Sequence, residues 1–529
     1  MKKLPLGIQN FREIIEENYV YADKTQFIYN LINNAKYYFL SRPRRFGKSL
    51  LLDTIAEAFS GDRELFKGLF IYNSDYDFKK HPVLRLDMSN ISNKTPKILE
   101  RSLIETLFDR VNKEELDITS DIPSNIFKTL IEALSKKYSQ RVVVLIDEYD
   151  KPILDHLDNI KIAEANRAVI KGFYGILKSM DPFLRLTFIT GVSKFTKTSL
   201  FSEMNNLFDI TLTKKYANIC GIATEDLERY FTAHIKDLAS GEDLGDYDRI
   251  RNEILTWYDG YSWDGRTRLI NPFSLLSFFS QERFSSFWYA SGTPTFLMEL
   301  IKEKPASFLS LKNLVISERV LDTADMRKIS VAPLLFQTGY LTIAERRIGA
   351  PETYLLQMPN FEVKEAFNLN VMAELTENEE HLAEAAYRKL QASLIACDLQ
   401  SMLDTMRGLF ASIPYQLHIA CETYYHSIFY AIMNLLGFEI DAEVSVSGGR
   451  IDGVLELEDK AYIIELKYKD CPHDITREAK QKIFEKALAE GMHQINEKGY
   501  HKKYAGSGKS IYKVVLVFLG RDNIEMVVE

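Results

Sequence analysis

Cysteine is scarce in this chain, and its pattern excludes two structural roles. Only four cysteines occur among 529 residues, and none has the CxxC spacing or the histidine partners of a zinc cluster. A disulfide framework is not expected either, so the thiols are expected to be reduced. No apolar run is long enough to cross a bilayer, and no apolar segment follows Met1-Lys2-Lys3 as it does in a signal peptide. We therefore expect a cytoplasmic protein with no membrane partner.

An excess of positive charge is also missing. The chain has 66 lysines and arginines against 74 aspartates and glutamates, a formal charge of −8. This balance excludes a protein coated in basic surface for passive nucleic-acid binding, so any DNA contact must be local. The length exceeds what one hydrophobic core supports, and the apolar content of 46% is ordinary for globular protein. Several folded domains are expected.

The first 215 residues alternate short apolar segments with longer segments of helical pattern, which predicts a parallel sheet covered by helices. Continuous apolar runs such as Val142–Ile146 are typical of strands buried on both faces. The expected strands are Tyr37–Ser41, Val83–Asp87, Val142–Asp147, Leu184–Thr190 and Phe208–Leu212. The expected helices are Lys48–Phe59, Pro96–Val111, Ser124–Tyr138 with Ser124 as its N-cap, and Ile162–Met180.

The run from Arg42 to Ser49 has the chemistry of a phosphate-binding loop. Such a loop turns backbone N–H groups, a lysine and a hydroxyl towards phosphates and Mg²⁺ at the start of a helix. Lys48 and Ser49 supply the last two groups, and we expect them to surround the phosphates together with the loop residues Arg44, Arg45, Phe46 and Gly47. The side chains of Arg44 and Arg45 fit a solvated loop equally well. Arg42 stands where the general pattern has its first glycine, and Pro43 restricts the backbone there by another route.

A second element of a nucleotide site follows about a hundred residues later. The apolar strand Val142–Ile146 ends in Asp147-Glu148, where Asp147 would hold Mg²⁺ through water and Glu148 would polarise the attacking water. The strand Leu184–Thr190 also ends in polar groups, so Thr190 or Ser193 is a candidate sensor of the γ-phosphate. Ordinary capping and turn chemistry explains those two hydroxyls equally well.

The pattern changes near Tyr216 to helices rich in aromatic residues, which suggests a lid or adaptor. The segments Leu335–Ile343 and Thr353–Met358 predict a hairpin of the winged-helix kind, joined through Arg346-Arg347-Ile348-Gly349. The arginine pair is also typical of a solvated turn. Residues Glu374–Phe410 are expected to form amphipathic linking helices.

The C-terminal part is expected to have the order αβββαβ. A helix is predicted near Glu422–Leu436 and a second near Thr476–Glu497. The expected strands are Asp441–Val446, Arg450–Glu456, Ala461–Lys467 and Tyr512–Phe518. The predicted carboxylates therefore fall on neighbouring strands.

Three residues of these strands fit metal-dependent hydrolysis of a phosphodiester. Glu465 and Lys467 are two apart and share one strand face, while Asp452 opens the neighbouring strand. Asp452 and Glu465 are the expected metal ligands, and Lys467 the cation near the attacking water or the transition-state charge. The spacing alone has little weight in a chain with 26% charged residues, but an acid and a lysine inside the apolar strand around Ile463-Ile464 are costly without a use. A structural Glu465–Lys467 ion pair is the plain alternative.

Other residues are weaker candidates for this site. Glu422 fits a third ligand or a solvated helix position, and Gln494 fits a supporting polar residue. Basic side chains around the predicted site would meet a phosphate backbone, or merely keep the helix soluble: Lys469, Arg477, Lys480, Lys482, Lys486, Lys498, Lys502 and Lys503.

Taken together, the motifs of this chain resemble those of an AAA-ATPase-like family that carries a C-terminal PD-(D/E)xK nuclease-superfamily domain. The resemblance extends over nearly the whole chain through Tyr21–Thr25, Arg42–Ser49, Val144–Pro152, Thr190–Phe195, Asn271–Ser274, Gly292–Pro294, Gly339–Thr342, Gly449–Asp452 and Glu465–Lys467. Arg42 in place of the first P-loop glycine is similar to what this family shows. Ile451 stands where the nuclease motif has its leading proline, a variation that the superfamily tolerates. The resemblance implies an ATPase domain coupled to a restriction-endonuclease-like domain.

The expected organisation has four parts: an AAA-like P-loop ATPase domain at 1–215, a helical lid and winged-helix region at 216–370, a helical linker at 371–414 and the nuclease-like domain at 415–529. The expected function is an ATP-binding and ATP-hydrolysing protein coupled to a DNA nuclease that uses Mg²⁺ or Mn²⁺, in defence or genome maintenance. The alternative is a nucleotide-dependent switch or scaffold that grips nucleic acid or protein without cutting. Both a monomer and a homo-oligomer fit the sequence.

Overall fold

The structure of the protein is a computed structural model that divides into two compact units. Unit 1 comprises 1–292 and 311–363, and unit 2 comprises 293–310 and 364–529. The described residues are 1–194, 200–201, 206–241, 243–288, 314–321, 331–376, 380–411, 425, 429, 433, 440–446, 449–457, 459–470, 475–497, 508–520 and 523–529. Among them, no helix has the length and apolar character that a membrane span requires. This division into two units does not test the four predicted domains, which stay a prediction.

Unit 1 is built on a five-stranded sheet in which every described pairing is parallel, with the order β2-β3-β4-β1-β5. Its strands are β1 (Tyr37–Ser41), β2 (Val83–Asp87), β3 (Val142–Asp147), β4 (Leu184–Gly191) and β5 (Phe208–Asp209). All residues of β1 and β3 are buried, as their unbroken apolar runs predict. The predicted parallel α/β sheet is confirmed.

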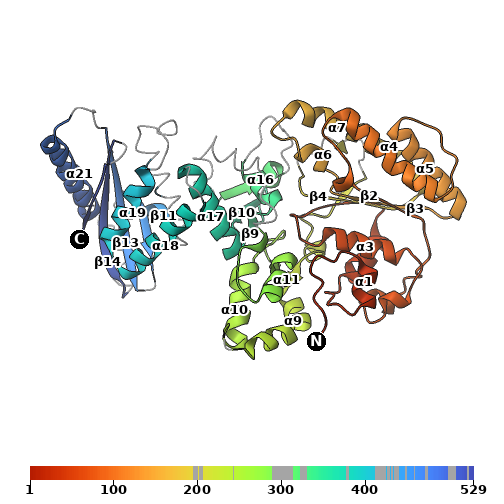
Figure 1. Cartoon of the computed structure of the whole chain (residues 1–529), viewed down its shortest axis with the longest axis horizontal. Coiled ribbons are helices and arrows are strands. Elements are labelled where there is room, and N and C mark those ends of the chain that lie inside the picture. The colour runs from red at the N-terminus through yellow and green to blue at the C-terminus, as the bar shows by residue number, and fades with distance from the viewer. Residues whose placement is uncertain are drawn as a thin grey trace. The chain divides into compact units, whose positions relative to one another are not determined.

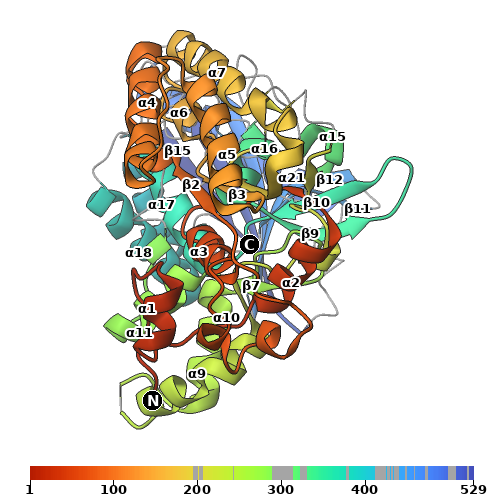
Figure 2. The ribbon, with the colours of Figure 1, turned by 90° about the vertical axis from the view of Figure 1, so that its right-hand side faces the viewer.

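Helices cover both faces of this sheet (Figures 1 and 2). On one face lie α4 (Pro96–Lys113), α5 (Pro123–Tyr138) and α7 (Ile160–Gly175), which pack on one another. On the other face lie α1 (Phe11–Glu16) and α3 (Lys48–Ala58). The remaining helical segments of this region are α2 (Thr25–Asn34), α6 (Lys151–Leu154), η1 (Glu64–Phe66), η2 (Phe70–Asn73), η3 (Met88–Asn90), η4 (Ile176–Lys178), η5 (Asp181–Phe183) and η6 (Lys214–Tyr216).

Two expectations about these helices are wrong. The N-cap of α5 is Ile122 rather than Ser124, because Pro123 occupies the first helical position, where its missing N–H costs nothing. The helix predicted to reach Met180 ends at Gly175 and continues as the separate 3₁₀ turn η4.

The helices of the predicted lid follow the sheet. They are α9 (Thr224–Ala239), α10 (Tyr247–Tyr258) and α11 (Pro272–Gln281), and they pack around one apolar core. The short strands β6 (Ile222–Ala223) and β7 (Leu269–Ile270) pair at its base.

The middle module of unit 1 comprises β8 (Leu314–Ser317), α15 (Glu318–Leu321), α16 (Val331–Thr338), β9 (Thr342–Arg347) and β10 (Thr353–Gln357). Its three strands form an antiparallel sheet of order β8-β10-β9, the arrangement of a winged helix. The hairpin is present, but the strand predicted over Leu335–Ile343 is wrong, because Leu335–Thr338 belong to α16 and β9 begins only at Thr342. A short apolar run does not distinguish a buried helix from a strand.

Glu362, in the first turn of α17 (Phe361–Thr376), is a fully buried carboxyl. Burial raises the pKa of Glu362 to about 8, although its Oε1 accepts a hydrogen bond from the backbone N of Trp288 at 2.6 Å. The unfolded chain ionises this carboxyl near pH 4.5, whereas the folded chain keeps the proton until about pH 8. Between these values the unfolded state binds fewer protons, so stability falls as pH rises.

Glu362→Gln is therefore expected to raise the thermal midpoint of unit 1 relative to wild type, by a margin that grows from pH 5 to pH 8.5. Glutamine imitates the protonated acid and does not titrate, and the difference is on the order of a few kcal/mol. Thermal scans of both proteins at the two pH values measure it, with the exposed Glu345→Gln as control. A margin that is equal at both pH values would contradict the buried, protonated carboxyl.

Unit 2 is a mixed five-stranded sheet with the order β11-β12-β13-β14-β15. Its strands are β11 (Ile440–Val446), β12 (Gly449–Glu456), β13 (Lys460–Lys469), β14 (Ser510–Leu519) and β15 (Asn523–Val528). β13 and β14 are parallel and the other neighbours antiparallel. The sequence predicted the first four strands but not β15. The helix predicted near Glu422–Leu436 lies mostly outside the described residues, and Glu422 wholly outside them.

Helices pack on both faces of this second sheet (Figure 1). α18 (Glu380–Ala396) and α19 (Leu399–Ala411) share a core with one face, and α21 (Arg477–Glu497) with the other. Side chains alternate along β13: Tyr462 and Leu466 face α18 and α19, whereas Ile463 faces α21. The acid and lysine of β13 therefore lie on the α21 face.

Candidate functional site

The phosphate-binding loop predicted in unit 1 leads from β1 into α3. Gly47 is the N-cap of α3 with φ +91°, a conformation that favours glycine, and no side chain caps this helix. The first N–H groups of α3 therefore have no side-chain acceptor at the cap, which is the arrangement that binds anions. Lys48 is buried, and its Nζ donates to the carbonyl oxygens of Arg42 at 3.1 Å and Pro43 at 3.0 Å.

The structure brings Ser49, Asp147 and Thr190 together at the carboxyl edge of the sheet. Ser49 Oγ donates to Asp147 Oδ2 at 2.6 Å, and Thr190 Oγ1 donates to Asp147 Oδ1 at 2.5 Å. The strand order explains the meeting, because β4 lies between the loop strand β1 and the acid strand β3. Hydroxyl and carboxylate oxygens are the ligands that Mg²⁺ prefers, so this donor set fits that ion.

Glu148 follows Asp147 in a strained backbone conformation. Its φ is +52°, which is uncommon for a residue with a side chain, and its backbone N donates to Asp147 Oδ1 at 3.0 Å. The side chain is partly exposed beside this acid. Strain of this kind gathers at functional sites.

The other predicted nucleotide contacts lie in different surroundings. Ser193 is buried and its hydroxyl donates to Asp150 Oδ2 at 2.5 Å, so the structure joins it to Asp150 rather than to Asp147. The Phe46 ring is fully buried against Tyr261 and Trp263, which leaves only its backbone for phosphate. Their nucleotide roles stay predictions.

The two loop arginines differ from each other. Arg45 is exposed, with φ +64° and its guanidinium over the ring of Phe273, while Arg44 is partly buried. The carbonyl oxygen of Arg44 accepts a hydrogen bond from Trp288 Nε1 at 3.0 Å.

Two structural residues of this site were missed from the sequence. Arg42 is fully buried beneath the loop, with its guanidinium 4.0 Å from the Trp263 ring centre and bonded to the carbonyls of Ser41 and Thr211. Burial lowers the pKa of Arg42 to about 10, so it stays charged at neutral pH. Asp150 accepts from the backbone N of Val192 and Ser193, and burial raises its pKa to about 6. Its place directly after Asp147-Glu148-Tyr149 was the available signal.

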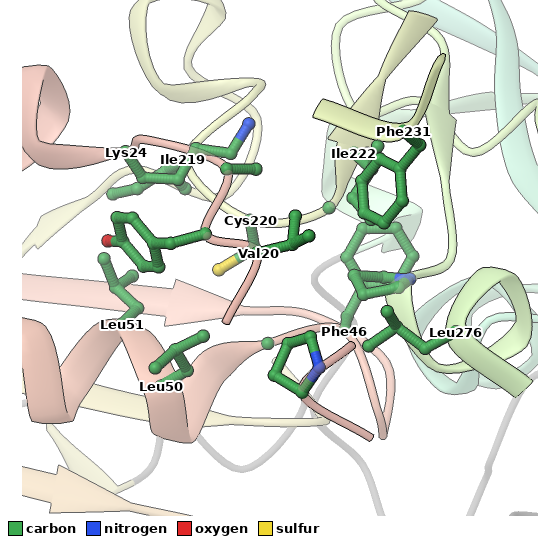
Figure 3. Close-up of a pocket in the computed structure, with 16 residues that line it drawn as sticks. Val20, Lys24, Phe46, Leu50, Leu51, Ile219, Cys220, Ile222, Phe231 and Leu276 are labelled. Atoms are coloured by element: carbon green, nitrogen blue, oxygen red, sulfur yellow. The ribbon is translucent and has the colours of Figure 1, made fainter. Parts of the chain in front are cut away.

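A pocket opens beside the start of α3 (Figure 3). Its cavity volume is about 100 Å³, and most of its lining is apolar. Leu50 and Leu51 of α3 face Ile222 and Phe231 across it, with Lys24 and Cys220 at its wall. Lys24 Nζ donates to Asp226 Oδ2 at 2.6 Å and Asn218 Oδ1 at 2.7 Å, which ties the N-terminal segment to the lid.

The predicted residues of unit 2 share the α21 face of the second sheet. Glu465 is fully buried, and Lys467 Nζ donates to its Oε1 at 2.7 Å and to Gln494 Oε1 on α21 at 3.0 Å. Asp452 on β12 accepts from the backbone N of Leu466 at 2.9 Å. The structure therefore joins Gln494, expected only as a supporting residue, directly to Lys467.

The donor set of unit 2 is limited among the residues that the structure describes. They contain no group of three or more histidines, cysteines or acids able to hold a metal ion. Asp452 and Glu465 still offer hard oxygen atoms, and Mg²⁺ is commonly held by one or two carboxylates with water and substrate phosphates. The basic residues Lys469 and Lys486 pair with Glu490, which reduces the local positive charge.

The two units thus define an ATPase-like domain joined to a nuclease-like domain. The family model described as "Predicted AAA-ATPase" matches residues 5–201, and that of the PD-(D/E)XK nuclease superfamily matches residues 420–526. A protein of Azotobacter chroococcum mcd 1, described as an uncharacterized protein in the vnfD 5' region, is 36% identical over 540 residues, covering 99% of this chain and 98% of the relative. The chain belongs to this family of AAA-ATPase-like proteins with a C-terminal PD-(D/E)XK domain.

A solved structure, the Aeropyrum pernix ORC2 protein in ADPNP–ADP complexes, is also similar to part of the chain. It is 12% identical, covers 69% of this chain and 98% of its own, and has a TM-score of 0.26.

Proposed function

We propose that the chain binds and hydrolyses ATP in unit 1 and uses the nucleotide to regulate metal-dependent cleavage of nucleic acid, DNA above RNA, in unit 2. The observation that supports this most is that each unit brings its predicted acids together with a hydroxyl or a lysine at one edge or face of a sheet. A cytoplasmic role in defence or genome maintenance, as a monomer or homo-oligomer, belongs to the same proposal.

In unit 1 the chain's own groups suit the β- and γ-phosphates. The first N–H groups of α3 would face the phosphates, and Lys48 would exchange the carbonyls of Arg42 and Pro43 for phosphate oxygens. Ser49 and Asp147 would hold Mg²⁺, which neutralises phosphate charge when bound. Glu148 would orient the attacking water, and Thr190 would keep Asp147 in place.

The nucleobase is proposed to occupy the pocket beside α3. The pocket adjoins Gly47 and Leu50, so a base placed there leaves its phosphates at the start of the helix. Its apolar walls would bury a flat heteroaromatic ring, and Lys24 is held at the rim by Asp226.

In unit 2 Asp452 and Glu465 would hold Mg²⁺ or Mn²⁺, which activates water for attack on phosphorus when bound. Lys467 is positioned by Glu465 and Gln494, and it would stabilise negative charge at the phosphate.

One observation favours the alternative, a nucleotide-dependent switch that binds without cutting. Glu465 is engaged by Lys467, and the described residues add no third acid to Asp452 and Glu465. A panel of labelled single-stranded, double-stranded and branched DNA and RNA, with Mg²⁺ or Mn²⁺ and with or without ATP, separates the two functions. Metal-dependent products support the nuclease, whereas ATP-dependent binding without products supports the switch.

Glu148→Gln is expected to preserve nucleotide binding while slowing hydrolysis roughly 10²–10⁴-fold, because glutamine keeps the shape but cannot accept the proton of water. Calorimetric titration with ATP and a phosphate-release assay measure the two effects separately. Glu115→Gln is the matched control, since Glu115 has a similar φ of +53° on an exposed turn. Normal turnover by Glu148→Gln would remove Glu148 from the catalytic role.

A further inference from the structure

Three residues that follow the lid contact the nucleotide site of unit 1 from outside the sheet. Trp288 Nε1 donates to the carbonyl oxygen of Arg44 at 3.0 Å. Gln337 Oε1 accepts from the backbone N of Lys194, beyond the end of β4, at 2.9 Å. Gly339 has φ +98°, and a Cβ there would lie 2.8 Å from Pro43 and 3.1 Å from the Trp288 ring. We call Trp288, Gln337 and Gly339 the clamp.

The clamp depends on α16 being packed inside unit 1. Val331–Gln337 are all buried, and Gln337 Nε2 also donates to the carbonyl of Leu321 at 2.8 Å. In winged-helix proteins that read DNA, the corresponding helix lies in the major groove. A helix buried on all sides offers no such surface. The middle module is therefore built for contact with the nucleotide site rather than for reading bases with α16.

The clamp contacts loop residues whose conformation nucleotide binding would change. Lys48 is satisfied by the carbonyls of Arg42 and Pro43, and Pro43 and Arg44 are the loop residues against which Gly339 and Trp288 lie. In the proposed nucleotide complex, Lys48 would leave those carbonyls for phosphate oxygens. The backbone held by the clamp is therefore the backbone that must adjust.

The clamp is also joined to the start of α17. The backbone N of Trp288 donates to Glu362 Oε1, and its ring packs on Tyr340 at 5.3 Å between ring centres. Glu362 belongs to unit 1, whereas α17 from Lys364 onward belongs to unit 2. Trp288 thus connects the loop, through its indole, and α17, through its backbone N, and α17 is a helix within which the chain passes from unit 1 to unit 2.

We propose that the clamp is an autoinhibitory contact: Trp288, Gln337 and Gly339 stabilise the nucleotide-free loop, and nucleotide binding releases them and with them the first turn of α17. The inference rests on the proposed nucleotide binding. A ligand shifts such an equilibrium only by its difference in affinity for the two states. Weakening the clamp must therefore tighten nucleotide binding.

The test uses the full chain with Trp288→Phe, which keeps an aromatic ring against Tyr340 but deletes the indole N–H. Arg44 is partly exposed, so water can satisfy its carbonyl and the variant is expected to fold, as a thermal scan checks. Affinity for ADP and for a non-hydrolysable ATP analogue, each with Mg²⁺, is measured by calorimetry. We expect binding roughly two- to tenfold tighter than wild type, the effect of one hydrogen bond. Tyr462→Phe in unit 2 is the control, because it also keeps an aromatic ring and deletes one side-chain donor to a backbone carbonyl, that of Leu394 at 3.0 Å.

Hydrogen exchange of the wild-type chain supplies the second readout. Saturating nucleotide is expected to increase exchange in 331–341 and 361–367, and Trp288→Phe is expected to show part of that increase without nucleotide. Gln337→Met, which removes the acceptor for Lys194, is the second clamp variant and is expected to give the same signs if Trp288→Phe does not fold.

The outcomes separate the two proposals. If a folded clamp variant binds nucleotide no more tightly than wild type, and exchange in these segments is unchanged by nucleotide, the clamp is overturned. The proposed ATP binding then stands. Wild-type protein that binds no nucleotide overturns both. Tighter binding by the variant together with the exchange response supports the clamp.

Discussion

Lys48→Ala is expected to abolish nucleotide binding at ordinary concentrations. Lys48 is the cation of the loop, buried at the start of α3 in a helix with no side-chain N-cap. Truncating one partner of a buried charge pair costs about 2–5 kcal/mol, which is roughly 30- to 4,000-fold in affinity. Calorimetry with ATP and Mg²⁺ measures the loss, and phosphate release should fall to background.

This variant also removes two hydrogen bonds of the nucleotide-free loop, so its folding needs a control. The carbonyls of Arg42 and Pro43 lose their lysine partner, and a thermal scan reports whether unit 1 remains intact. Lys36→Ala is the matched variant, since Lys36 precedes β1 and pairs with Asp181 on the surface. If folded Lys48→Ala bound ATP like wild type, the P-loop assignment would be lost.

The parallel sheet of unit 1 could be predicted because its buried strands are continuous apolar runs in the sequence. β1 and β3 are buried along their whole length, so nearly all of their residues are apolar, and this pattern is visible in the sequence. α16 could not be recognised in the same way, since a short helix buried on all sides has the same apolar pattern as a strand.

The contacts of the site were less predictable because they depend on strand order and on distant segments. Thr190 meets Asp147 because β4 lies between β1 and β3, an order that no local pattern records. Arg42 is held by Trp263, far along the chain, so the sequence gives no sign that this arginine supports the loop from beneath. Gln494 was easier to place, because α21 packs on the strand that carries Lys467.

The nuclease proposal makes its largest prediction at Asp452 and Glu465. Replacing either by alanine is expected to remove metal-dependent cleavage while leaving ATP hydrolysis largely intact, because the acids belong to unit 2 and the P-loop to unit 1. Loss of one preorganised charge-stabilising group costs on the order of 2.7–4 kcal/mol in the transition state, or roughly 10²–10³ in rate. Single-turnover cleavage gives the rate of nucleic-acid cleavage, and phosphate release from the same preparations gives the rate of ATP hydrolysis.

Glu456→Ala tests whether such an effect belongs to the site rather than to the strand. Glu456 lies on β12 like Asp452, but it is exposed and pairs with Lys509. Glu465 is buried against Lys467, so its removal leaves a lysine without that partner, and thermal scans must show that unit 2 stays folded. Asp452→Ala is the cleaner variant, because the carboxylate is partly exposed and its bond to the Leu466 N–H is replaceable by water. Equal cleavage by Asp452→Ala and wild type would assign the products to another nuclease, and ATP-dependent nucleic-acid binding would then be the function that remains for this face of the sheet.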